Sequence, residues 1–118
     1  MSKYANPGEM RTAVEFRQIQ RTHDNDGFPI EEAVNVFGPG AAVMVKWVNA
    51  HGNESFIAMQ LELREPATLT MRYSPRINRE LLVFRRGDPD PYEIISIDNV
   101  EQRGEWLEIK VQRLLGAR

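Results

Sequence analysis

The segment WLEIKVQRL, Trp106 to Leu114, decides the fold class because its apolar residues recur at every second position. Leu107, Ile109 and Val111 share one face of an extended strand, and polar residues occupy the other face. Six earlier segments repeat this alternation, with turn-forming residues between them: TAVEFRQI (12–19), IEEAVNVF (30–37), AAVMVKWV (41–48), TLTMRY (68–73), ELLVFRR (80–86) and YEIISID (92–98). Seven short strands favour a β-barrel or a β-sandwich. We expect an all-β fold, a small barrel of about six to seven mostly antiparallel strands with one short α-helix.

The helix is expected in GNESFIAMQLELREP, residues 52–66, where two periodicities overlap. Asn53 suits an N-cap, and Glu54 favours the first turn of a helix. Helical spacing relates Phe56, Met59, Gln60 and Leu63, whereas strand alternation relates Ile57, Met59, Leu61 and Leu63. We predict a short helix from about Glu54 to Gln60 that gives way to a strand.

Composition limits the classes of protein to consider. A chain of 118 residues predicts one domain spanning residues 1–118, with residues 1–8 as an N-terminal arm. The chain has no cysteine, which excludes disulfides, thiol catalysis and thiolate metal sites. No apolar segment resembles a signal peptide or a membrane span, so we expect synthesis and assembly in the cytoplasm and no membrane partner. The formal charge is -2 without a basic stripe, which argues against free-standing DNA binding.

Two observations indicate a protein partner. Arginine outnumbers lysine twelve to three, and arginine is the cation better suited to interfaces. Several predicted strands are also apolar on both faces: Met44 and Val48 oppose Val45 and Trp47, and Leu82 and Phe84 oppose Leu81 and Val83. A small barrel buries only one face, so the second face must be covered by the helix, by a long loop or by another copy of the chain, and we favour contact between subunits.

The stretch HDNDGFPIEE, His23 to Glu32, looks like a calcium loop. With Gly27 at position 6 of an EF-hand, Asp24 and Asp26 fall at positions 3 and 5. Positions 1 and 12 are then Thr22 and Ala33, so the closing bidentate glutamate is absent. We interpret the stretch as a turn, and we predict no metal site.

Other chemical motifs are weak. His23 and His51 fall in predicted loops without a spacing that would pair them, and no serine or glycine-rich loop matches a nucleophile or phosphate motif. GDPDP, residues 87–91, predicts a rigid hairpin connection. We expect no enzyme activity, no cofactor and no small-molecule substrate.

The order of motifs resembles the head–tail joining family of tailed bacteriophages, also called head-closure or head–tail adaptor proteins. The resemblance runs from about Pro7 to Leu114. The matching positions are Pro7, Gly8, Glu9, Arg11, Gly27, Gly52, Glu54, Arg72, Tyr73, Ile77, Gly87, Tyr92, Glu93 and Ile94. Met10 replaces the usual leucine, PDP lengthens the hairpin after Gly87, and REPA interrupts the strand before residue 68.

This resemblance implies a structural protein of the virion neck. Such proteins form a ring beneath the portal and its adaptor, close the channel after DNA packaging, and dock the tail. The implied partners are portal, adaptor and tail proteins and further copies of the chain, with DNA only as cargo. A tail-completion or tail-terminator ring is the alternative on the tail side. A small barrel that stacks single-stranded nucleic acid on exposed aromatic residues is the remaining alternative.

Two polar loops are the candidate interaction sites, around residues 22–29 and 49–55. Their candidate contact residues are His23, Asp24, Asn25, Asp26, Gly27, Asn49, His51 and Asn53. Near a DNA channel, Asp24 and Asp26 are expected to repel phosphate, which favours passage of DNA over binding.

Overall fold

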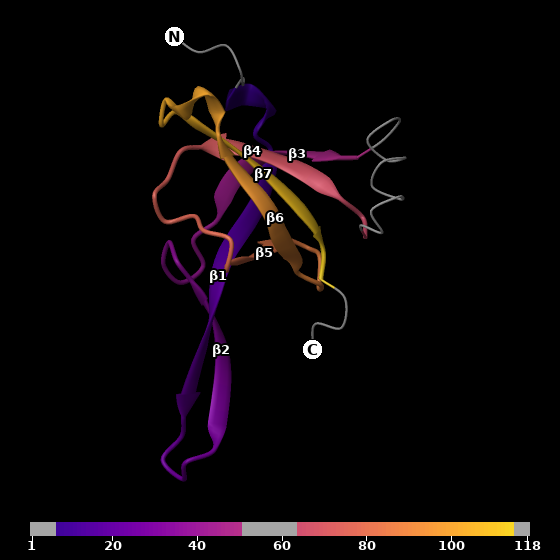
Figure 1. The fold of residues 1–118 in the computed structure, drawn as a ribbon. Coiled ribbons are helices and arrows are strands. Elements are labelled where there is room, and N and C mark those ends of the chain that lie inside the picture. The colour runs from indigo at the N-terminus through magenta and orange to yellow at the C-terminus, as the bar shows by residue number, and fades with distance from the viewer. Residues whose placement is uncertain (1–6, 51–63, 115–118) are drawn as a thin grey trace.

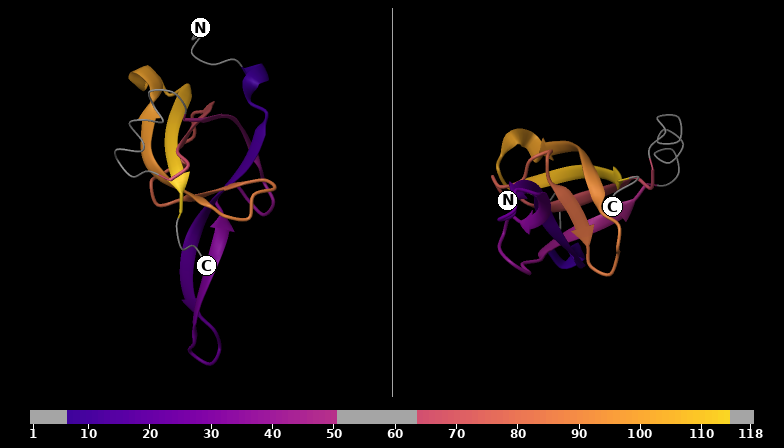
Figure 2. Two further views of the ribbon diagram at one scale, coloured as in Figure 1. Left: turned by 90° about the vertical axis from the view of Figure 1, so that its right-hand side faces the viewer. Right: turned by 90° about the horizontal axis from the view of Figure 1, so that it is seen from below.

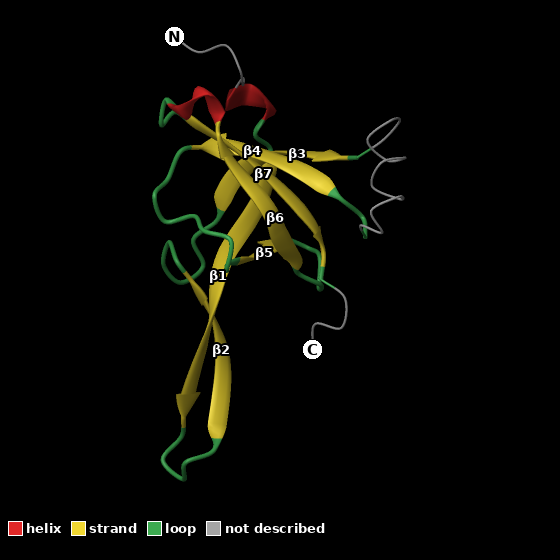
Figure 3. Ribbon diagram, in the orientation of Figure 1, coloured by secondary structure: helices red, strands yellow, loops and turns green. Residues whose placement is uncertain are grey.

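The computed structural model describes residues 7–50 and 64–114, whose regular secondary structure consists almost entirely of strands (Figure 3). The elements are η1 (Pro7–Glu9), β1 (Thr12–His23), β2 (Pro29–Asn35), β3 (Val43–Asn49), β4 (Ala67–Arg72), β5 (Leu82–Arg85), β6 (Tyr92–Asn99), η2 (Val100–Gln102) and β7 (Trp106–Arg113). Every strand pair is antiparallel.

Six of the strands close into a barrel, and β2 extends it. The sheet order is β2-β1-β3-β4-β7-β6-β5, and an additional pairing of β1 with β5 joins the two ends of the six-stranded part. Figure 1 shows the barrel above a long hairpin formed by β1 and β2, and the left view in Figure 2 shows the same arrangement. Closure removes the free edges that an open sheet would present.

The strand β1 belongs to both parts. Val14 pairs with Val43 of β3 and with Arg85 of β5, so these two strands lie on opposite edges of β1. Arg17 likewise pairs with Leu82 of β5 and with Asn35 of β2. The strands β2 and β3 therefore follow one another along the same edge of β1.

The core lies inside the barrel and consists mainly of inward-facing residues of the six barrel strands. Its fully buried members are Val14, Phe16, Val45, Leu69, Leu81, Val83, Ile109 and Val111. Phe37 packs edge-on against Phe16 with ring centroids 6.2 Å apart. Period-two alternation therefore separates core from surface, as it must in a pleated strand.

The structure confirms the all-β barrel and the seven strands predicted from alternation. The strand predicted to end at Ile19 continues to His23, and the strand predicted over residues 80–86 is confined to Leu82–Arg85. The helix predicted from Glu54 to Gln60 lies outside the described residues. No α-helix occurs in residues 7–50 and 64–114.

Replacement of a core side chain tests this architecture. Phe16→Ala leaves a cavity beside Phe37 and is expected to lower the free energy of unfolding by about 3–5 kcal/mol. The matched control is Ile19→Ala in the outer part of β1, which is expected to change it by less than about 0.5 kcal/mol. Urea denaturation followed by tryptophan fluorescence measures both, and equal losses in the two variants would contradict the assigned core.

Candidate interaction surfaces

The hairpin of β1 and β2 is the most exposed feature of the described chain. We call residues 18–34 the ribbon, because only two strands form it and it projects beyond the barrel (Figure 1). Every residue from Ile19 to Ala33 is exposed. A side chain on the ribbon therefore meets solvent or a partner, whichever face it occupies.

The turn at the ribbon's tip is held by one carboxylate. Oδ1 of Asp24 accepts hydrogen bonds from the backbone N–H groups of Asp26 and Phe28, each at 2.9 Å. Gly27 has φ of 84°, a left-handed conformation that glycine adopts without steric cost. Asp24 thus shapes an Asx-type turn, as the interpretation of this stretch as a turn expects. Among the residues that the structure describes, no group of three acidic or histidine side chains is arranged to hold a metal ion.

Apolar side chains are exposed along the ribbon. Phe28 is 65% exposed beside the tip, and Ile19 and Ile30 are also exposed. Arg21 donates from Nε to Glu31 across the strands at 2.8 Å, but both groups are so exposed that the pair contributes little stability. The ribbon combines apolar contact area with charge, as protein interfaces do.

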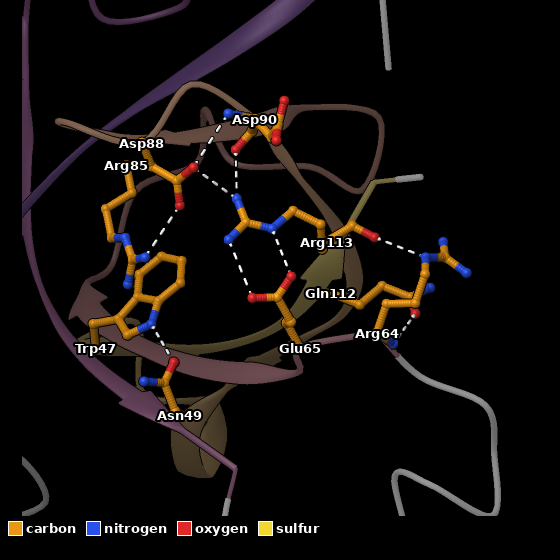
Figure 4. A network of polar contacts seen from close by, with 9 residues as sticks. All are labelled: Trp47, Asn49, Arg64, Glu65, Arg85, Asp88, Asp90, Gln112 and Arg113. Atoms are coloured by element: carbon orange, nitrogen blue, oxygen red, sulfur yellow. Dashed lines mark hydrogen bonds and ion pairs between the residues drawn. The ribbon is translucent and has the colours of Figure 1, made fainter. Parts of the chain in front are cut away.

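A second polar feature lies at one end of the barrel, around Arg113 (Figure 4). Its guanidinium donates to Asp88 at 2.7 Å, to Glu65 at 3.2 and 3.3 Å, and to the backbone oxygen of Asp90 at 3.0 Å. Arg85 also donates to Asp88, at 3.1 Å. The network joins the end of β7 to the segment before β4 and to the β5–β6 turn.

Aromatic rings lie beneath these cations. Arg113 is 4.3 Å from the centroid of Tyr92, and Arg85 is 4.6 Å from the centroid of Trp47. The two rings meet edge to face at 4.8 Å. Guanidinium groups over aromatic faces add cation–π attraction to the ion pairs. The two guanidinium groups therefore cover the aromatic rings at this end of the core. Asp88 and Glu65 neutralise their positive charge.

The surroundings of Asp88, Arg113 and Tyr92 shift the pKa values of these three groups. Hydrogen bonding from Arg113 holds the pKa of Asp88 below its ordinary value, against the opposing effect of burial. The hydrogen bonds that Arg113 donates to Glu65 and Asp88 raise the pKa of its guanidinium. Burial raises the pKa of the Tyr92 phenol. The shifts of Asp88 and Arg113 both favour the ionised forms that make up the ion pair.

A shallow hollow of about 440 Å³ lies where η1 leads into the barrel. Met10, Val43, Met44, Met71 and Arg72 line it. Figure 1 shows η1 at the end of the barrel away from the ribbon, so the hollow and the ribbon tip are far apart. Methionine side chains adapt to irregular partners, so the hollow is a second candidate contact surface.

The structure separates the predicted contact residues. His23 ends β1, and residues 24–27 form the ribbon tip. Asn49 ends β3 on the barrel, where its Oδ1 accepts a hydrogen bond from Nε1 of Trp47 at 3.0 Å. His51 and Asn53 lie outside the described residues. Asn49 and the ribbon tip therefore do not belong to one surface.

Sequence reasoning missed the Arg113 network and the exposed apolar residues of the ribbon. Arg113, Glu65 and Asp88 are distant in sequence, and no motif connects them. The abundance of arginine over lysine was the available signal, since arginine is the cation that forms forked pairs. For the ribbon, the signal was the acidic composition of residues 24–34, which contain Asp24, Asp26, Glu31 and Glu32.

Comparisons with known proteins point in one direction. The family model described as phage head completion protein matches residues 5–114. A solved structure, the solution structure of protein SF1141 from Shigella flexneri 2a, aligns with a TM-score of 0.65 at 19% sequence identity. The alignment covers 96% of this chain and all of that one, and at this identity it shows the fold alone. No curated protein matches the sequence. Within the described ranges, no helix is long and apolar enough to cross a membrane.

The pH dependence of stability tests the Arg113 network. Because the pKa of folded Asp88 lies below its unfolded value near 3.9, ionised Asp88 stabilises the fold at neutral pH. That stabilisation is expected to fade as the pH falls below about 4 towards the folded pKa. Asp88→Asn removes it, so the difference in unfolding free energy between wild type and variant should be constant from about pH 7 to 5 and shrink below about pH 4.

The matched variant is Arg113→Met, which keeps the apolar stem but removes the donor to Asp88. We expect it to lose the same acid-dependent component and to be destabilised by about 1–3 kcal/mol at neutral pH. Denaturant titrations at each pH measure both effects. A difference between wild type and Asp88→Asn that stays constant down to pH 2 would contradict the assigned ion pair.

Proposed function

The chain belongs to the phage head completion protein family, and from this premise we propose that it forms a ring beneath the portal at the head–tail interface. The ring closes the portal channel after DNA packaging and presents a docking surface for the tail. Membership implies a phage structural protein that contacts other head or tail components. The observation that carries the finer proposal is the ribbon, an exposed arm held by a closed barrel.

The division of the molecule into a closed barrel and a projecting ribbon supports this role. A barrel without free edges keeps its shape when it is placed beside another copy. The side chains of Met44 and Val48 remain exposed on the outer face of β3, where a neighbouring subunit could bury them. The ribbon extends the reach of each subunit beyond the barrel, towards the channel or towards a neighbouring neck protein.

The charge of the ribbon supports passage of DNA over binding. Between residues 18 and 34, Arg21 is opposed by Asp24, Asp26, Glu31 and Glu32. Such a segment repels phosphate, while DNA-binding surfaces concentrate cations. Arginines also lie over the rings of Phe84, Trp106, Phe37, Trp47 and Tyr92. Those ring faces are covered, and the most exposed aromatic side chain of the described residues, Phe28, lies on the acidic ribbon. Both features disfavour the alternative in which nucleic-acid bases stack on aromatic rings.

Attachment to heads is the direct test of the proposal. The purified chain is expected to co-sediment with DNA-filled heads that carry the portal, and to reduce the release of DNA on dilution. Because the proposed docking surface for the tail belongs to the ring assembled on a head, the free chain should not bind isolated tails that lack heads. Binding to the tails alone would identify a tail-completion or tail-terminator ring, and binding to neither would overturn the proposed function.

Shortening the ribbon tests its role in docking. Deletion of Asp24 to Gly27 removes a turn whose hydrogen bonds lie within residues 24–28, so the melting temperature should change little. Complementation of a phage that lacks the protein should then yield heads without tails. Asn25→Ala, which keeps the turn length and Asp24, is the matched control and should support tailed particles. Normal yield from the deletion would show that the tip is dispensable.

A further inference from the structure

Within residues 7–50 and 64–114, the outer backbone edges of the ribbon lack strand partners. There, β1 pairs with β5 only over residues 14–17 and with β3 only over residues 12–14, so beyond Arg17 its second edge is open to other described strands. β2 pairs with β1 alone in the part of the chain that the structure describes. A single two-stranded hairpin is marginally stable in water, and open edges invite a further strand.

Two hydrogen bonds identify the backbone groups that point outward. The N–H of Val36 donates to the oxygen of Phe16 at 3.0 Å, and the N–H of Asp24 donates to the oxygen of Phe28 at 2.9 Å. Antiparallel strands alternate bonded and non-bonded pairs, so the even-numbered residues between these limits bond within the ribbon. The odd-numbered residues point their N–H and C=O groups outward: Ile19, Arg21 and His23 on β1, and Glu31 and Ala33 on β2. Pro29 belongs to the same odd set, and its missing N–H therefore removes no bond from the ribbon.

The two edges carry complementary charge. Residues 18–23 on β1 contain Arg21 and no carboxylate, whereas residues 29–34 on β2 contain Glu31 and Glu32 and no cation. A β2 edge against another β2 edge would place like charges opposite one another, which destabilises cross-strand pairs. A β1 edge against a β2 edge places opposite charges together. Charge thus favours one pairing of two identical chains and disfavours another.

We propose that the β1 edge of each ribbon pairs antiparallel with the β2 edge of the ribbon in the next copy. This inference rests on the proposed ring, for which it names the contact between subunits. Rotation about a ring axis points all ribbons the same way, so β2 of one copy runs antiparallel to β1 of the next. The contact is heterologous, and its repetition closes a continuous sheet through all subunits.

The alternation of hydrogen bonds also sets which side chains meet. Only odd-numbered residues offer outward backbone groups, so odd residues of β1 must pair with odd residues of β2 across the new edge. Paired residues share one face of the sheet, which places Arg21 and Glu31 of successive copies on the same face. The Arg21–Glu31 pair within each ribbon then becomes part of a ladder of alternating charges around the ring.

Engineered cysteines test the pairing, because the natural chain has none. One chain carries Ile19→Cys, and a second chain carries Glu31→Cys, Ala33→Cys or Asn35→Cys, a panel that covers shifts of register by two residues. Equal amounts of the two chains are bound to DNA-filled, portal-bearing heads, oxidised, and examined for disulfide-linked dimers. A disulfide within one chain cannot form, and the reach of a disulfide restricts linkage to adjacent strands.

We expect one member of the panel to give at least about tenfold more dimer on heads than in free solution, because attachment raises the effective concentration of neighbouring cysteines. Ile19→Cys alone should not dimerise, since identical positions lie two strands apart. The matched control replaces Ile19→Cys with Gln20→Cys, whose side chain lies on the opposite face, and should give no dimer.

A second variant tests the backbone directly. Ala33→Pro removes an outward N–H but none of the hydrogen bonds within the ribbon. The substitution is placed in the chain that carries Glu31→Cys or Asn35→Cys, and it should reduce the yield of disulfide-linked dimer about tenfold or more. Ala33→Val, which keeps the N–H, should not.

The outcomes separate this inference from the function on which it rests. If the wild-type chain fails to attach to heads, the proposed ring fails and the edge pairing fails with it. If the wild-type and cysteine chains attach but no member of the panel dimerises, or if Gln20→Cys dimerises equally well, the edge pairing alone is overturned.

Discussion

The pairing of β1 with β5 is the contact on which the rest of the structure depends. Without it, the seven strands would form an open sheet with β2 at one edge and β5 at the other. With it, six strands enclose one core and leave no open barrel edge in the described chain. Because β5 has only four residues, it occupies a short part of β1, and the remaining length of β1 must leave the barrel. Barrel and ribbon are therefore two consequences of the same mismatch in strand length.

The Arg113 network completes the end of the barrel where side-chain packing alone does not. Trp47 and Tyr92 bring apolar rings to this end, and Arg85 and Arg113 lie over them. Two cations above aromatic rings need counter-charge, which Asp88 supplies to both. Glu65 adopts φ of 41°, a conformation that costs a non-glycine residue roughly 1–3 kcal/mol. The two hydrogen bonds that Glu65 accepts from Arg113 offset part of that cost. The strained backbone at Glu65 is therefore tied to the Arg113 network.

Local pattern and long-range geometry explain what the sequence could and could not predict. Alternation of apolar and polar residues predicts the core strands, because one face of each is buried. It fails at the outer part of β1, where Gln20, Arg21 and Thr22 carry no apolar signal although the backbone is paired. Asp24 and Gly27 allowed the turn to be predicted, since both act on their own neighbours. The ion pairs of Arg113 were beyond prediction because they depend on register between strands far apart in sequence.

In the proposed ring, the modest strength of each ribbon edge has a consequence for assembly. The β2 edge offers outward N–H donors at Glu31 and Ala33 but none at Pro29, so few backbone bonds form per contact. A free pair of chains must offset the loss of translational and rotational freedom with these few bonds. Chains already held side by side on a portal need not, because their effective concentration is high. An edge too weak to polymerise the free protein can thus still join neighbours once the head has positioned them.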